Sequence, residues 1–107
     1  MTKCEFFRDG ARITGFSISG HSGYAEAGSD IVCAAISAVV GMVEATINDV
    51  CGGKAKVRVK EADTRITLTL PTVCEEEEAI QAVLAGMMLY LLSLRDDYSD
   101  YIEVLEV

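Results

Sequence analysis

The chain's only histidine and one of its four cysteines stand in an arrangement that suits nucleophilic chemistry. His21 follows Gly20 at the end of a predicted strand, and Cys33 lies near the start of an apolar segment after a glycine-rich loop. The thiolate is the nucleophilic form of cysteine, and a neighbouring imidazole can accept the thiol proton. If the loop brings its two ends together, these side chains form a nucleophile and its general base.

Asp30 is predicted to cap the helix that carries Cys33, which places the cysteine in the first helical turn. Free backbone N–H groups and the helix dipole stabilise a thiolate there, and the N–H groups of Cys33 and its neighbours could also hold an oxyanion. Asp30 could in addition orient His21, as the third member of a triad does. A carboxylate beside Cys33 would, however, oppose formation of the thiolate.

Two further side chains of this region have alternative interpretations. Ser37 lies one helical turn beyond Cys33, so its hydroxyl either bonds near the sulfur or bonds a backbone carbonyl one turn back. Tyr24 either stacks on a substrate or packs over the base of the loop. From the residues alone, Cys33 also fits a core cysteine and His21 an uninvolved loop histidine.

The elements that must position these residues begin with a hairpin. Alternating hydrophobicity predicts strands over residues 2–8 and 11–19, and Asp9-Gly10 between them is a strong signal for a tight turn. Strict alternation places three side chains of the second strand on one face: Thr14, Phe16 and Ile18.

A loop over residues 20–30 connects this hairpin to the first helix. It contains Gly20, Gly23 and Gly28. The helix is predicted over residues 31–50 and ends at Cys51-Gly52-Gly53, because glycine readily adopts the left-handed stop. It is apolar on nearly every side for three turns, so we expect it to be mostly buried.

The second half of the chain repeats the pattern of strand pair and helix. A hairpin is predicted over residues 55–60 and 65–70, with inward side chains Val57, Val59, Ile66, Leu68 and Leu70. A second helix starts at Glu75 with four glutamates, and a short strand follows over residues 100–107. The order ββαββαβ predicts an α+β sandwich in a single domain of residues 1–107, with one largely antiparallel sheet covered by two helices.

Charge and hydropathy narrow the range of partners. The formal net charge of −8 argues against direct binding of nucleic acid and suits a basic partner. The apolar stretch over residues 31–43 is shorter than the about 20 residues that span a bilayer, so we expect no membrane association. The polar, mixed residues 1–8 do not resemble a secretory leader, so a cytoplasmic protein is expected.

The cysteine pattern does not indicate a metal or another cofactor. No Cys-x-x-Cys pair occurs, and one histidine does not complete a typical structural zinc site. The other three cysteines are interpreted as small packed hydrophobic residues: Cys4, Cys51 and Cys74.

Two segments resemble the pattern of the ribosomal-processing cysteine protease family of Firmicutes and related bacteria. They are Gly20-His21-Ser22 and Gly28-Ser29-Asp30-Ile31-Val32-Cys33-Ala34-Ala35-Ile36-Ser37. The family pattern is a Gly-His pair, a short loop with Tyr or Phe and Gly, then Asp-Ile-Val-Cys-Ala-Ala and a Ser one turn on. The resemblance extends to the chain length and the order of elements. Ser22 departs from it, since Ala is common there.

The resemblance implies a cysteine endopeptidase without cofactors. Its substrate would be large-subunit ribosomal protein twenty-seven, whose N-terminal extension is removed during ribosome maturation. It implies that His21 and Cys33 are catalytic, with Asp30 and Ser37 in supporting positions. The substrate is basic, which agrees with the acidic charge of this chain.

The resemblance also implies a homodimer and a loop that closes over substrate. Gly20 would be the hinge, and the substrate loop would include Ser22, Gly23, Tyr24 and Gly28. Independently of the resemblance, surplus apolar residues on the expected outer side of the second helix favour dimerisation: Met88, Leu89, Tyr90 and Leu92.

Two other functions fit the same residues. One is a non-catalytic, ribosome-associated binding or assembly module of the same fold, in which the cysteine and histidine only pack. The other is a redox sensor that uses Cys33 without a base. No cysteine close to Cys33 in sequence could resolve a sulfenate, which weighs against the sensor.

Overall fold

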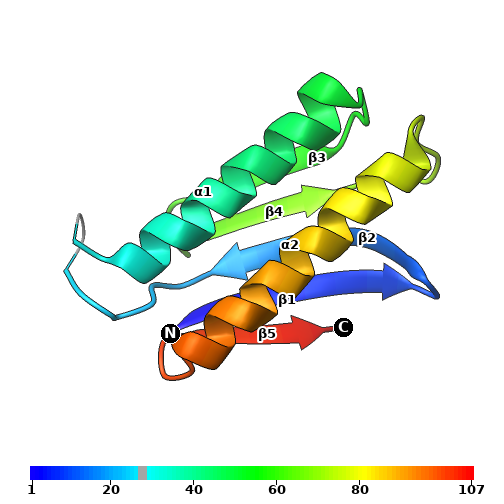
Figure 1. Ribbon diagram of the computed structural model, residues 1–107. Coiled ribbons are helices and arrows are strands. Elements are labelled where there is room, and N and C mark those ends of the chain that lie inside the picture. The colour runs from blue at the N-terminus through cyan, green and yellow to red at the C-terminus, as the bar shows by residue number, and fades with distance from the viewer. Residues whose placement is uncertain (27–28) are drawn as a thin grey trace.

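The protein folds into a five-stranded sheet with two long helices on one face (Figure 1). The computed structural model describes residues 1–26 and 29–107. The strands are β1 (Thr2–Asp9), β2 (Arg12–Ser19), β3 (Lys56–Lys60), β4 (Arg65–Thr69) and β5 (Ile102–Glu106). The helices are α1 (Ile31–Ala45), continued by the π-helical turn η1 (Thr46–Val50), and α2 (Glu77–Asp97). The strand order is β3-β4-β2-β1-β5, and the β1–β5 pair is parallel while the other pairs are antiparallel. The predicted α+β fold is confirmed.

The first hairpin contains a bulge that changes which residues reach the core. The register between β1 and β2 shifts beside Phe7, so Thr14 becomes an extra residue in β2. Ile13 therefore turns inward and is 3% exposed, on the same side as Phe16 and Ile18. Strict alternation predicted Thr14 on the face of Phe16 and Ile18, but Ile13 takes that place because the bulge breaks the period of two.

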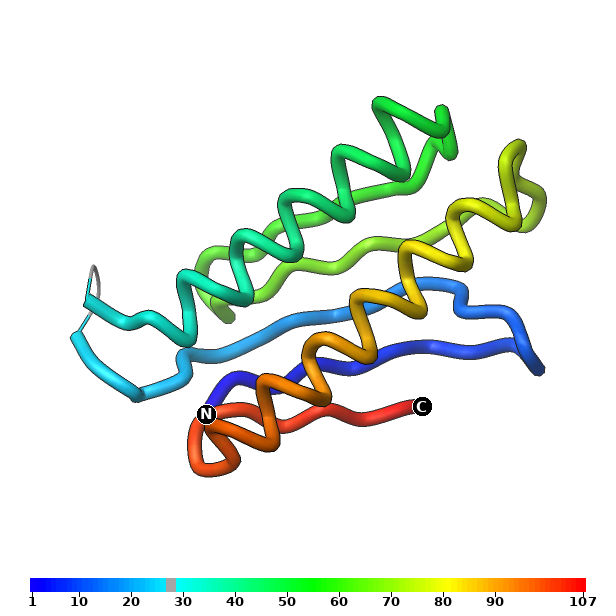
Figure 2. Tube along the Cα trace, viewed as in Figure 1, coloured from blue at the N-terminus to red at the C-terminus, as the bar shows by residue number. Residues whose placement is uncertain are grey.

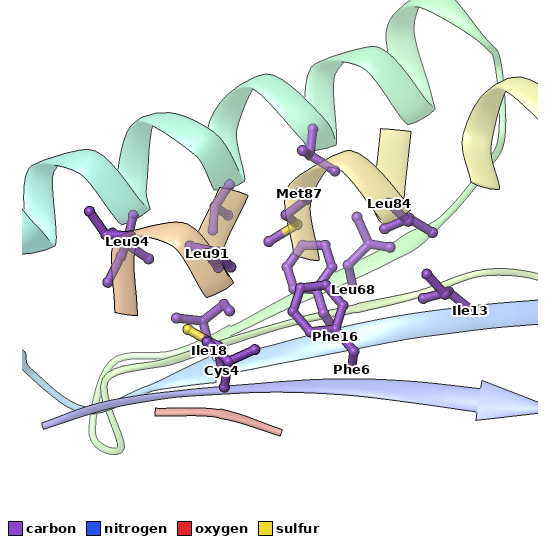
Figure 3. Close-up of a cluster of buried hydrophobic side chains, with 14 of the residues drawn as sticks. Cys4, Phe6, Ile13, Phe16, Ile18, Leu68, Leu84, Met87, Leu91 and Leu94 are labelled. Atoms are coloured by element: carbon purple, nitrogen blue, oxygen red, sulfur yellow. The ribbon is translucent and has the colours of Figure 1, made fainter. Parts of the chain in front are cut away.

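The core lies between the sheet and the two helices. Figure 3 shows Phe6 and Phe16 of the hairpin below Leu84 and Leu91 of α2, and the two phenyl rings are 6.2 Å apart. These four side chains are fully buried, and each contributes about 1.5–3 kcal/mol through the apolar surface removed from water. Cys4 is buried in the same cluster, and Cys51 and Cys74 pack against it, as predicted.

Helix α1 buries one face rather than most of its surface. Val32, Ile36 and Val40 pack on the sheet, whereas Ile31 and Met42 are 54% and 59% exposed. The expectation of a mostly buried helix was wrong, because a two-layer fold leaves the outer side of each helix facing solvent.

By length and composition alone, Ile31–Val50 and Glu77–Asp97 could each cross a membrane, but core helices that pack on a sheet satisfy the same criterion. The apolar stretch over residues 31–43 is shorter than either of these helices.

The edge strand β3 is less covered than predicted. Val57 is half-buried, but Val59 is 65% exposed and lines a cavity beside the N-terminal part of α1. Alternation indicates the face of a side chain but not whether a helix covers it. The loop after β2 and the β3–β4 turn lie at the same end of the molecule, and a hydrogen bond from the Gly20 N–H to the Thr64 carbonyl joins them at 3.1 Å (Figure 2).

Candidate active site

Asp30 caps α1 and places Cys33 in the first turn of the helix. Its Oδ1 accepts hydrogen bonds from the backbone N–H groups of Val32 and Cys33, at 3.0 Å each, which confirms the predicted cap. Its Oδ2 accepts a hydrogen bond from the Ser22 hydroxyl. The Ser22 bond, followed by the Cys33 N–H, lowers the pKa of the Asp30 carboxyl to about 2. Asp30 is therefore a carboxylate at neutral pH.

The first backbone donors of α1 are already engaged in this arrangement. Asp30 Oδ1 takes the N–H groups of Val32 and Cys33, and the Ala34 N–H donates to the Asp30 carbonyl at 3.0 Å. These groups were expected to hold an oxyanion. The structure differs from that expectation because Asp30 occupies the same donors through its carboxylate and its backbone carbonyl.

Ser22 is a central residue of the site rather than an exposed part of the loop. It is 2% exposed, and its hydroxyl oxygen lies 3.5 Å from the Cys33 sulfur. The same oxygen accepts a hydrogen bond from the Tyr24 N–H at 3.2 Å. That serine turn is a local motif, so the sequence carried a signal for it that was missed.

His21 lies in the same site as Cys33 but bonds a different residue. Its Nε2 is 3.3 Å from the Thr64 hydroxyl, and the ring is exposed. In residues 1–26 and 29–107, no hydrogen bond joins His21 to the Cys33 sulfur or to Asp30. Sequence reasoning missed Thr64, because this contact joins residues 43 positions apart in the chain.

Two cavities meet at the catalytic candidates. The first, the sheet-side cavity, has a volume of about 630 Å³. Its lining includes the apolar side chains Ile18, Ile36, Val59 and Ile66. The second, the loop-side cavity, has a volume of about 540 Å³ and includes Gly23 and Asp30. His21, Cys33 and Ser37 line both cavities. A peptide chain in these cavities would therefore pass the cysteine and the histidine.

The remaining predicted site residues are placed as follows. Ser37 is exposed, and its hydroxyl makes no hydrogen bond with the Cys33 sulfur within the described part of the chain. Tyr24 packs edge-on against Tyr98 and Tyr101 of the α2–β5 connection, with ring centroids 5.5 and 5.1 Å apart. Gly28 lies outside the described residues.

Two glycines of the loop have positive φ. Gly20 has φ of 85°, and a Cβ atom there would lie 2.7 Å from the Met1 carbonyl oxygen. Gly23 has φ of 76° and open space around it. Only glycine fits easily at Gly20, which agrees with a special role for this position.

The residues that the structure describes contain no group of three or more His, Cys, Asp and Glu side chains that could hold a metal ion. A thiol in the first turn of a helix, lining the same cavities as a histidine, provides the residue types that a cysteine peptidase uses. The fold and the site thus define a small α+β protein with a candidate cysteine-peptidase site.

Comparisons with known proteins specify the family. Residues 1–103 match the family described as cysteine protease Prp. The ribosomal processing cysteine protease Prp of Bacillus subtilis (strain 168) is 32% identical over 95 residues, which cover 86% of this chain and 84% of the relative. The chain belongs to the Prp family of ribosomal processing cysteine proteases.

Solved structures show the same fold. The ribosomal processing protease Prp from S. aureus with a covalently linked product peptide superposes with a TM-score of 0.89 at 21% identity, covering 100% of both chains. The S. aureus protein with a substrate peptide gives a TM-score of 0.84 at 19% identity, again over 100% of both chains. At these identities the likeness establishes the fold.

Proposed function

We propose that this chain is a cysteine endopeptidase in which Cys33 is the nucleophile and His21 the general base. Its substrate would be the N-terminal extension of large-subunit ribosomal protein twenty-seven. The observation that carries the proposal is the position of Cys33: it lies in the first turn of α1 and lines the same two cavities as His21, in a chain of the Prp family.

The reaction would proceed through a covalent thioester. A ring nitrogen of His21 takes the thiol proton, and the Cys33 sulfur forms a bond to the scissile carbonyl carbon while the carbonyl electrons move to oxygen. Collapse of this tetrahedral intermediate breaks the C–N bond, and the imidazolium gives its proton to the leaving amine. Water, deprotonated by His21, then attacks the thioester and releases the acid product and the Cys33 thiol.

This mechanism requires His21 to exchange partners. The imidazole bonds Thr64 in the structure, and it must turn toward Cys33 when substrate is bound. The ring is exposed, so no packed side chain opposes the turn. The preceding Gly20, with φ of 85°, supports the proposed role of this position as the hinge of a loop that closes over substrate.

The proposed substrate agrees with the shape and charge of the site. The apolar side chains of the sheet-side cavity suit hydrophobic residues of a peptide. The net charge of −8 favours encounter with a basic ribosomal protein. The S. aureus relative has been captured with a substrate peptide and with a covalently linked product peptide, which supports a covalent mechanism acting on a peptide.

The test is cleavage of a synthetic peptide that spans the extension and the mature start of that ribosomal protein. Mass spectrometry would locate the cut, with Cys33→Ala and His21→Ala as variants. We expect one cut that both variants abolish. An intact peptide with the folded wild-type protein would reject this substrate. If Cys33 also failed to react with iodoacetamide, the non-catalytic binding module would replace the peptidase.

The proposed enzyme is a homodimer of the cytoplasm. Leu89 and Tyr90 of α2 are 64% and 47% exposed, whereas Met88 and Leu92, also expected on the outer side, pack against the core. All four cysteines are free, which agrees with a reducing compartment. A monomeric mass by light scattering at micromolar concentration would contradict the dimer.

A further inference from the structure

The hydroxyl of Ser22 has three described partners that together use its full bonding capacity. A serine hydroxyl has one proton to donate and two lone pairs that accept. The Tyr24 N–H, at 3.2 Å, is a donor and takes one lone pair. The remaining partners are the Asp30 Oδ2 and the Cys33 sulfur.

Asp30 decides the direction of the remaining bonds. The carboxylate has no proton at neutral pH, because its pKa is lowered to about 2. The single proton of Ser22 must therefore go to Asp30 Oδ2. The second lone pair of Ser22 is left facing the Cys33 sulfur at 3.5 Å. That contact is favourable when the sulfur carries a proton and donates it to the oxygen.

We propose that Ser22 is a positioning residue for the resting Cys33 thiol: its oxygen accepts the S–H proton, and the Asp30 carboxylate fixes that direction. A thiolate at the same place would face the lone pair of the Ser22 oxygen, with the Asp30 carboxylate behind that oxygen, and both would repel it. This inference rests on the proposed function, because it describes the resting state of the nucleophile. It also accounts for the tension between Asp30 and thiolate formation.

The other charged groups around Cys33 act in both directions. The helix dipole favours a thiolate, but the first N–H groups of α1 are engaged by Asp30. His21, on the loop, bonds Thr64. The β3–β4 end of the sheet-side cavity contributes two cations and one anion, Lys60, Arg65 and Glu61.

Activation then consists of moving one proton. The S–H bond of Cys33 breaks and an N–H bond forms on His21, so the pair becomes thiolate and imidazolium, while Ser22 and Asp30 keep their protonation. The sulfur must leave the Ser22 lone pair for this transfer.

The test measures the reactivity of Cys33 in the full chain without any substrate. The alkylation rate by iodoacetamide is followed from pH 5 to 10, and peptide mapping isolates Cys33 from the other cysteines. In Ser22→Ala we expect the rate profile to move to lower pH. The rate at pH 7 should rise about threefold to tenfold, the size expected when one neutral hydrogen bond is lost.

Ser17→Ala is the matched control. Ser17 is also 2% exposed, and its hydroxyl accepts hydrogen bonds from Arg65 and Thr67 rather than bonding Cys33 or Asp30. Loss of this buried hydroxyl should leave the alkylation profile of Cys33 unchanged. A Ser22→Ala profile that stays in place or moves to higher pH would overturn the proposal, as would an equal shift in both variants.

Asp30→Asn is a second test of the hydrogen-bond direction. Asparagine keeps the oxygen that caps α1 but replaces Oδ2 by an N–H donor, which reverses the Ser22 hydroxyl and points its proton at the sulfur. The profile should again move to lower pH, and an unchanged profile would overturn the proposal even if Ser22→Ala failed to fold. Because alkylation needs no peptide, failure of peptide cleavage with these shifts intact would reject the proposed function alone.

Discussion

Cys33 and His21 line the same cavities but are held in opposite ways. Cys33 is half-buried in α1, and its surroundings are fixed by Ser22 and Asp30, which are near neighbours in sequence. His21 is exposed, and its ring bonds Thr64 from a distant turn. The difference indicates that the proposed nucleophile is positioned by local hydrogen bonds, whereas the position of the proposed base is adjustable and depends on the tertiary fold.

The largest effect is expected at Gly20, which lies between the end of β2 and His21. In Gly20→Ala, the new Cβ would lie 2.7 Å from the Met1 carbonyl oxygen at a φ of 85°. The resulting shift of His21 should lower kcat/KM for the peptide by about a hundredfold, as expected for a misplaced catalytic group. Gly10→Ala is the control, since Gly10 has φ of 61° but open space and lies in the β1–β2 turn. Equal losses in both variants would contradict this role of Gly20.

A smaller effect should follow from freeing the histidine. Thr64→Val keeps the shape of the side chain but removes the hydroxyl that bonds His21 Nε2. Because that bond competes with the move toward Cys33, the single-turnover rate should rise about twofold to tenfold. Thr64→Ser keeps the hydroxyl and should match the wild type. A rate that falls in Thr64→Val alone would mean that Thr64 orients the base instead of retaining it.

The loop between β2 and α1 should contribute to stability through the aromatic contact of Tyr24. Tyr24→Leu removes the edge-on packing against Tyr98 and Tyr101. The free energy of unfolding should fall by about 0.5–1.5 kcal/mol, as measured by urea denaturation. Tyr24→Phe keeps the ring and serves as the control. No difference between the two variants would show that the ring contact does not hold the loop.

The smallest effect concerns how the thermal stability of the protein falls at acidic pH. The pKa of Asp30 lies at about 2 in the folded chain, below its ordinary value of 3.8. A lowered pKa contributes stability above pH 3.8 that is lost as the pH falls through about 2. Thermal unfolding between pH 5 and pH 2 should therefore show a steeper fall in Tm for the wild type than for Asp30→Asn. Parallel curves would contradict the contribution of Asp30.

The fold was predictable because local patterns agree with the tertiary structure. Alternating strands, the Asp9-Gly10 turn and the glutamate-rich start of the second helix correctly indicated the order of elements. The errors fall where a local pattern lacks tertiary information. The bulge at Thr14 and the exposure of Val59 depend on strand register and on which strand lies at the edge.

The site was predictable to the same degree. Asp30 as helix cap follows from its type and place, and the structure confirms it. The contact between His21 and Thr64 has no local signal, since it requires the β3–β4 turn to fold back beside the loop. Burial of Ser22 also depends on the tertiary fold, whereas the resemblance implied only that this residue belongs to the substrate loop.

The most direct measurement for the central claim is capture of the covalent intermediate on Cys33. The protein would be mixed with the peptide, quenched in acid within the first turnover and mapped by mass spectrometry. The proposed mechanism predicts a thioester between the N-terminal product fragment and Cys33, absent in Cys33→Ala. Cleavage that persists in Cys33→Ala, without any adduct on the wild type, would contradict the assignment of Cys33 as the nucleophile.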